Sequence, residues 1–274
     1  MLFPATVALL LAVSIASRMD DCASLAKKIG SAYIHVVATQ YLPQGSVIDH
    51  RSEGLDVTYQ MTPAPPMPVG LCRAILNVTT SLSSSIMVEA WLPDESKGRL
   101  LSVGNRKFDG CVEYPQMAHG MYLGFATVSS NGGHNGSSAS ALLDQPKVLT
   151  DHSWRGVQQA TVAGKALVTE YYGSNAWKSY HIGCATGARQ GIRVAQLDPE
   201  LFDGIVAGPP ASNFGTIVMW YGAVLEGIFH GNDTYLTKEN WDLVHEEMLS
   251  QCNELDGAED DIIKDPRRCH LETR

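Results

Sequence analysis

In the first two thirds of the chain, several short apolar runs are followed by one long stretch of helical periodicity. The helical stretch is 154–172, which places apolar and small residues on one broad face and predicts a helix. The runs that precede it are bounded by polar or turn-forming residues. They predict strands at 71–80, 85–92, 100–103 and 124–129.

A strand–turn–helix pattern follows this helix, with a strand at 179–183 and a helix at 186–197 that Pro199 ends. A further strand is predicted at 202–207, and helices at 214–230 and 238–252. Strands that alternate with helices are typical of a mainly parallel α/β sheet. Because only one convincing strand follows the helix at 186–197, we expect the sheet to be incomplete within this sequence.

The composition of the 274-residue chain narrows the classes of function. Its hydrophobic fraction of 45% and mean hydropathy of -0.06 are typical of a globular protein. Its net charge of -9 argues against a nucleic-acid partner, because polyphosphate repels an acidic surface. The apolar runs are shorter than a membrane-spanning helix requires, so no membrane partner is expected once the leader is removed.

Several features predict a secreted, extracellular protein. Residues 1–16 resemble a signal peptide, with cleavage after Ala16; a buried N-terminal helix is the alternative. Six cysteines in an exported chain suggest disulfides. Sequons for N-glycosylation occur at Asn77, Asn135 and Asn232.

The segment between the predicted strand and helix carries the main chemical signal. Gly183, Cys184 and Gly187 lie in the frame of a Gly-x-Ser-x-Gly nucleophile elbow, but Ala185 holds the serine position. An elbow presents one side-chain oxygen at the top of an α/β-hydrolase sheet, and alanine has no oxygen to present.

The elbow and its flanks resemble the fungal tannase/feruloyl esterase family of secreted carboxylic ester hydrolases. The similar segments are 72–93, 100–105, 124–134, 160–173, 179–211 and 255–269. The resemblance implies an α/β-hydrolase fold that is incomplete at the C-terminus, and it covers roughly the N-terminal half of a typical member. The implied organisation is a signal peptide at 1–16, a partial catalytic domain at 17–213 and the start of a lid domain at 214–274.

The resemblance also implies roles for individual positions. Ala185 occupies the nucleophile position, the N–H of Thr186 is an oxyanion donor, and Cys184 holds the place of a cysteine that pairs with one beside the catalytic histidine. That histidine, its cysteine and the catalytic aspartate are expected beyond Arg274. The chain also departs from the family pattern at two further places, where the family has glycine. Arg106 and Lys107 replace glycines in the oxyanion loop, and Ala188 replaces a glycine in the elbow.

By the same resemblance, Ca²⁺ is expected in the segment 253–262. The implied ligands are Asn253, Asp256, Asp260 and the backbone carbonyls of Ala258 and Ile262, all oxygen donors of the kind that calcium prefers. Asn253 replaces the usual aspartate and Asp261 replaces a glycine. A solvated acidic turn is the alternative.

Disulfides are expected between Cys252 and Cys269, which flank this loop, and between Cys22 and Cys72. A Cys72–Cys111 bridge is the alternative for the second pair. Cys184 is expected to be an unpaired thiol within this sequence.

The functional prediction is therefore a carboxylic ester hydrolase scaffold for plant phenolic esters, either small or linked to the cell wall. We expect no triad-dependent activity from this chain, because Ala185 lacks the attacking oxygen and the rest of the triad is missing. The alternative is a secreted pseudoenzyme that binds phenolic esters or glycans without cleaving them. His181 and Asp203 are predicted to have structural roles.

Overall fold

The computed structural model describes residues 3–49, 66–173, 178–229 and 235–272. The chain forms two compact units, Met1–Ser212 and Asn213–Arg274. The sequon at Asn232 lies outside the described residues, whereas Asn77 and Asn135 are exposed.

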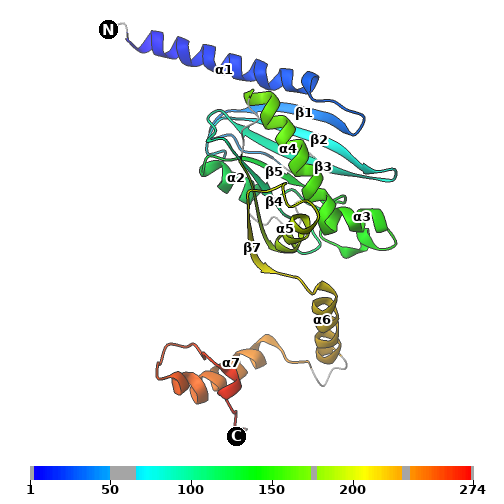
Figure 1. Cartoon of the computed structure of the whole chain (residues 1–274). Coiled ribbons are helices and arrows are strands. Elements are labelled where there is room, and N and C mark those ends of the chain that lie inside the picture. The colour runs from blue at the N-terminus through cyan, green and yellow to red at the C-terminus, as the bar shows by residue number, and fades with distance from the viewer. Residues whose placement is uncertain (1–2, 50–65, 174–177, 230–234, 273–274) are drawn as a thin grey trace. The chain divides into compact units, whose positions relative to one another are not determined.

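Within the described residues of the first unit, seven strands form one mixed sheet in the order β1-β2-β3-β5-β4-β6-β7 (Figure 1). The strands are β1 (Ile34–Leu42), β2 (Leu71–Ser81), β3 (Ser84–Pro93), β4 (Arg99–Val103), β5 (Ala126–Ser130), β6 (Lys178–Ala185) and β7 (Gly204–Pro210).

The expectation of a mainly parallel sheet is wrong for one side of it. The pairs β1–β2, β2–β3 and β3–β5 are antiparallel, whereas β4–β5, β4–β6 and β6–β7 are parallel. A two-residue turn at Leu82 and Ser83 joins β2 to β3, and such a short turn permits only antiparallel pairing. The strand β1 was not predicted, because its partly exposed side chains give no clear apolar run.

Side chains alternate between two core clusters on the two faces of the sheet, as the period of two in a strand requires. In β3, Val88 and Ala90 join one cluster with residues of helices α1 (Phe3–Lys28) and α4 (Gly156–Tyr172). Trp91 joins the other cluster, with residues of α2 (Tyr114–Tyr122). The sheet is therefore covered by helices on both sides (Figure 1).

Two helices of the first unit lie close to their predicted positions, whereas α2 and the short helices that precede α4 were not predicted. Helix α5 (Thr186–Leu197) has the predicted bounds, whereas α4 begins two residues later than predicted. The reason is a π-helical turn at Asp151–Arg155, whose buried Asp151 and His152 face inward. Short helices α3 (Pro146–Thr150) and η1 (Ala139–Leu142) precede this turn.

A fully buried polar cluster connects β2, β3 and α2. Arg73 donates to Glu89 through Nε at 2.9 Å and Nη2 at 2.7 Å. Glu89 also accepts from Trp91 Nε1 at 3.0 Å and from the Tyr114 hydroxyl at 2.6 Å. The carboxylate of Glu89 is thus surrounded by four donors, which is what a charge in the core requires.

Both expected disulfides are present. Cys22 pairs with Cys72 and joins α1 to β2, so the Cys72–Cys111 alternative is wrong. Cys252 pairs with Cys269 in the second unit.

The second unit contains α6 (Phe214–Phe229) and α7 (Lys238–Cys252), followed by the 3-10 turns η3 (Asn253–Asp256) and η4 (Pro266–Arg268). Thr237 caps α7, because its side chain accepts from the backbone N–H of Asn240. Within the described residues, no helix combines the length and apolar character that crossing a bilayer requires.

Candidate functional site

Ala185 has the backbone of a nucleophile elbow. It ends β6 and precedes α5, with φ 52° and ψ -104°, a conformation that costs a residue with a side chain about 1–3 kcal/mol. The residue that follows β7 supports it, because the N–H of Ala211 donates to the Ala185 carbonyl at 3.2 Å. The elbow is therefore formed although its oxygen is missing.

Gly183 and Gly187 are required by close backbone approach. A Cβ at Gly183 would lie 2.2 Å from the carbonyl carbon of Gly187, and a Cβ at Gly187 would lie 2.9 Å from the Asn105 carbonyl oxygen. Only glycine allows β6, the first turn of α5 and the loop after β4 to meet this closely.

A side-chain clamp holds the loop after β4 against α5. The N–H of Asn105 donates to Gln190 Oε1 at 2.9 Å, and Gln190 Nε2 donates to Asn105 Oδ1 at 3.0 Å. Gln190 also donates to the His152 carbonyl at 2.5 Å. Both side-chain amides are buried, so their hydrogen bonds restrain the loop relative to the elbow. The sequence alone did not identify these two residues, although both lie inside the segments that resemble the family.

Two carbonyls of the same loop have side-chain partners. The Lys107 carbonyl accepts from the Thr186 hydroxyl at 2.8 Å and lies 3.3 Å from His152 Nε2, while His134 Nε2 lies 2.7 Å from the Phe108 carbonyl. Lys107 itself has a φ of 41°, which lies in the left-handed region that favours glycine.

The two histidines of this loop environment are close to one another. The rings of His134 and His152 are 5.1 Å apart. Burial, together with the nearby His134, lowers the pKa of His152 to about 4, so its ring is neutral near pH 7. A neutral ring with Nε2 protonated suits a donor to the Lys107 carbonyl.

Arg106 is directed toward an acidic partner. Its Nε lies 3.1 Å from Oε2 of Glu113, whose side chain is buried whereas that of Arg106 is half exposed. The charge of Arg106 is thus neutralised by an ion pair at the loop.

His181 and Asp203 have the structural partners that the sequence interpretation expected. His181 Nε2 lies 2.9 Å from the Gly187 carbonyl, and burial lowers the pKa of this histidine to about 4. Asp203 pairs with Lys178 at 2.6 Å and accepts from the Ser179 N–H at 2.8 Å. Among the described residues, neither His152 nor His181 pairs with a carboxylate in the way that a triad base would. Cys184 is exposed and forms no disulfide within the described part of the chain.

The segment proposed for calcium is a compact loop in which the expected oxygen donors serve local turns. Asp256 Oδ1 accepts from the N–H of Ala258 at 3.0 Å, and Asp260 Oδ1 accepts from the N–H of Ile262 at 3.1 Å. Among the described residues, no three His, Cys, Asp or Glu side chains are grouped as metal ligands. The buried Oδ1 of Asn253, however, has no hydrogen-bond partner.

The mixed sheet, the helices on both faces and the strained elbow define an α/β hydrolase. The model of the family "Tannase and feruloyl esterase" matches residues 72–274. The chain belongs to this family.

Relatives with curated descriptions support this assignment. The chain is 40% identical over 267 residues to "Probable feruloyl esterase B-2" of Aspergillus fumigatus, which covers 95% of this chain and 50% of the relative. It is 45% identical over 203 residues to "Probable feruloyl esterase B-1" of Aspergillus terreus, covering 73% of this chain and 38% of that protein. The chain thus spans half or less of the length of these relatives.

Solved structures agree on the fold. An esterase from Aspergillus oryzae superposes with a TM-score of 0.83 at 39% identity, covering 93% of this chain and 50% of that structure. Feruloyl esterase B from the same species gives a TM-score of 0.80 at 38% identity, with 92% and 49% covered.

Proposed function

We propose that the chain is a carboxylic ester hydrolase scaffold of the feruloyl esterase/tannase type, shaped for plant phenolic esters and without triad-dependent turnover as it stands. The observation that carries this proposal is the backbone of Ala185. The elbow keeps the strained φ of 52° at the nucleophile position, yet it presents a methyl group there.

The electrostatic part of the site supports an ester-hydrolase ancestry. Thr186 begins α5, so its N–H lies in the first turn, where backbone donors lack helical partners and can bind an oxyanion. The Asn105–Gln190 clamp fixes the loop that would supply the second donor. Loss of the serine alone costs a triad enzyme a factor on the order of 10⁶ in kcat.

We expect the purified chain to hydrolyse methyl ferulate no faster than buffer. Ala185→Ser in the same chain should stay at the buffer rate, because the two buried histidines beside the elbow contact backbone carbonyls and do not act as its base. The measurement is release of ferulate by chromatography, with residue 185 confirmed by mass spectrometry. Hydrolysis by the unmodified chain well above buffer would refute the proposal.

A secreted pseudoenzyme that binds phenolic esters or glycans is the second candidate, and the intact elbow backbone favours it over a collapsed site. Saturable binding of methyl ferulate without turnover would support this candidate. We also propose export, with a signal peptide at 1–16 and glycosylation at the exposed Asn77 and Asn135.

We further propose that the loop after α7 binds Ca²⁺. The unpartnered Oδ1 of Asn253 is an oxygen donor available to a cation, and Asp256 and Asp260 add carboxylates. Asp261 has a φ of 61°, which accounts for the glycine that the family pattern places there. Bound calcium would tie the two arms of the loop together.

Calcium titrated into the EDTA-treated chain should bind at one site, as measured by calorimetry. Asp260→Asn should weaken binding at least tenfold, because it removes a charge from the ligand set. Asp242→Asn is the matched control, since Asp242 is exposed and pairs with Lys238 on α7, outside the loop. Equal affinity in both variants would contradict the site and favour a solvated acidic turn.

A further inference from the structure

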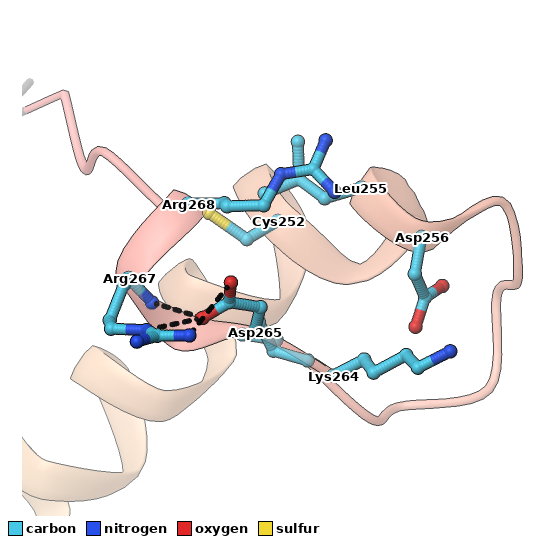
Figure 2. Close-up of a pocket in the computed structure, with 8 residues that line it drawn as sticks. Cys252, Leu255, Asp256, Lys264, Asp265, Arg267 and Arg268 are labelled. Atoms are coloured by element: carbon cyan, nitrogen blue, oxygen red, sulfur yellow. Dashed lines mark hydrogen bonds and ion pairs between the residues drawn. The ribbon is translucent and has the colours of Figure 1, made fainter.

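The second unit contains a pocket that lies outside the elbow and shares only Asp256 with the proposed calcium ligands. It has a volume of about 450 Å³ and lies where the end of α7 meets the segment that returns to Cys269 (Figure 2). Eight residues line it: Cys252, Leu255, Asp256, Ile263, Lys264, Asp265, Arg267 and Arg268. All eight belong to Asn213–Arg274.

The pocket gathers positive charge in an acidic part of the chain. Residues 213–274 contain five Lys or Arg and thirteen Asp or Glu. Three of those five cations, Lys264, Arg267 and Arg268, line this single pocket. Cations that cluster in an otherwise acidic unit create a local positive potential, which attracts an anionic ligand.

One of the three cations is already neutralised within the pocket. Arg267 Nε lies 2.8 Å from Asp265 Oδ1, and Arg267 also bonds to the second oxygen of this carboxylate. Lys264 and Arg268 form no ion pair within 4.0 Å among the described residues, and both are exposed. These two side chains are therefore available to a ligand.

The walls of the pocket are apolar as well as charged. Leu255 and Ile263 contribute aliphatic surface, and Arg268 lines the same pocket. A planar guanidinium in a partly aliphatic pocket suits an aromatic ring, because Arg stacks on aromatic faces while its N–H groups bind a carboxylate. The volume lies within the range of small-molecule sites.

The pocket is held in shape by covalent and polar links. The Cys252–Cys269 disulfide joins its two arms. Beside it, Gln251 donates to the Glu272 carbonyl at 3.1 Å and accepts from the Glu272 N–H at 2.9 Å. A pocket fixed in this way binds with a smaller loss of conformational entropy.

We propose that this pocket is a binding site for a small aromatic carboxylate, with Lys264 and Arg268 holding the carboxylate and Leu255 and Ile263 contacting the ring. The inference goes beyond the proposed esterase scaffold and does not depend on it, because none of the lining residues belongs to the elbow.

The test is a titration of the full chain with 4-hydroxybenzoate, followed by ligand-observed NMR and calorimetry. EDTA is present throughout, because Asp256 is also proposed as a calcium ligand. We expect saturable binding that Lys264→Met and Arg268→Gln each weaken at least fivefold. Both side chains are exposed, so neither change should unfold the unit, and circular dichroism checks this.

Two sets of controls separate the proposal from general charge attraction. Lys238→Met removes the same charge from α7, outside the pocket, and should change the affinity less than twofold. Methyl 4-hydroxybenzoate, which lacks the charge, should bind at least tenfold more weakly. The proposal is overturned if no saturable binding occurs, if Lys238→Met matches Lys264→Met, or if inorganic phosphate binds as well as the aromatic acid.

Discussion

Replacing Arg73 with methionine should lower the free energy of unfolding of the first unit by about 3–5 kcal/mol. The substitution leaves the Glu89 carboxylate in the core with two donors, from Trp91 and Tyr114, in place of four. A buried charge without its counter-ion pays a desolvation penalty that the remaining hydrogen bonds do not offset. Urea unfolding followed by circular dichroism measures the change.

The double variant Arg73→Met, Glu89→Met should recover part of the loss, because it removes both charges together and replaces them with apolar volume. Lys178→Met is the surface control, because its ion pair with Asp203 is exposed and screened by solvent and therefore contributes little to stability. Equal losses in Arg73→Met and Lys178→Met would show that the buried cluster is not a major source of stability.

Gly183→Ala should destabilise the first unit by about 3 kcal/mol or more, at the upper end of overpacking effects. The added Cβ would lie 2.2 Å from the Gly187 carbonyl carbon and 2.7 Å from the Ala188 nitrogen. These are backbone atoms of the first turn of α5, which cannot rotate away as a side chain can. The elbow must therefore shift as a whole, and urea unfolding measures the cost.

Gly30→Ala is the matched control, since a Cβ there meets no atom within 4 Å and the residue has no positive φ. It should leave stability unchanged or raise it slightly. A similar result for Gly183→Ala would mean that the elbow is not packed as closely as the structure indicates.

Much of the fold follows from patterns that the chain displays locally. Helix α5 has the predicted bounds because the elbow glycines and Pro199 mark its two ends. Helix α7 also has the predicted bounds, because its helical periodicity ends at Cys252. The antiparallel side of the sheet was harder to predict. The β1 strand has largely exposed or half-buried side chains and depends on pairing with β2, a contact that no local pattern reveals.

In the site, too, a local motif identified some residues from the sequence and left others unidentified. The elbow positions were recognisable because glycine and a sharp turn leave a motif. The Asn105–Gln190 clamp joins residues that are 85 positions apart, so neither residue signals its partner. His152 was missed because it lies in a π-helical turn, where the spacing of inward-facing residues differs from that of an α-helix.

The strained backbone at position 185 determines what a substitution there would require. A φ of 52° is unfavourable for alanine, so the neighbouring strand and helix must impose it. The geometry thus belongs to the scaffold and not to the residue that occupies it. A serine at this position would add one oxygen atom with no rearrangement of the main chain, so the backbone alone determines where a side-chain oxygen would lie.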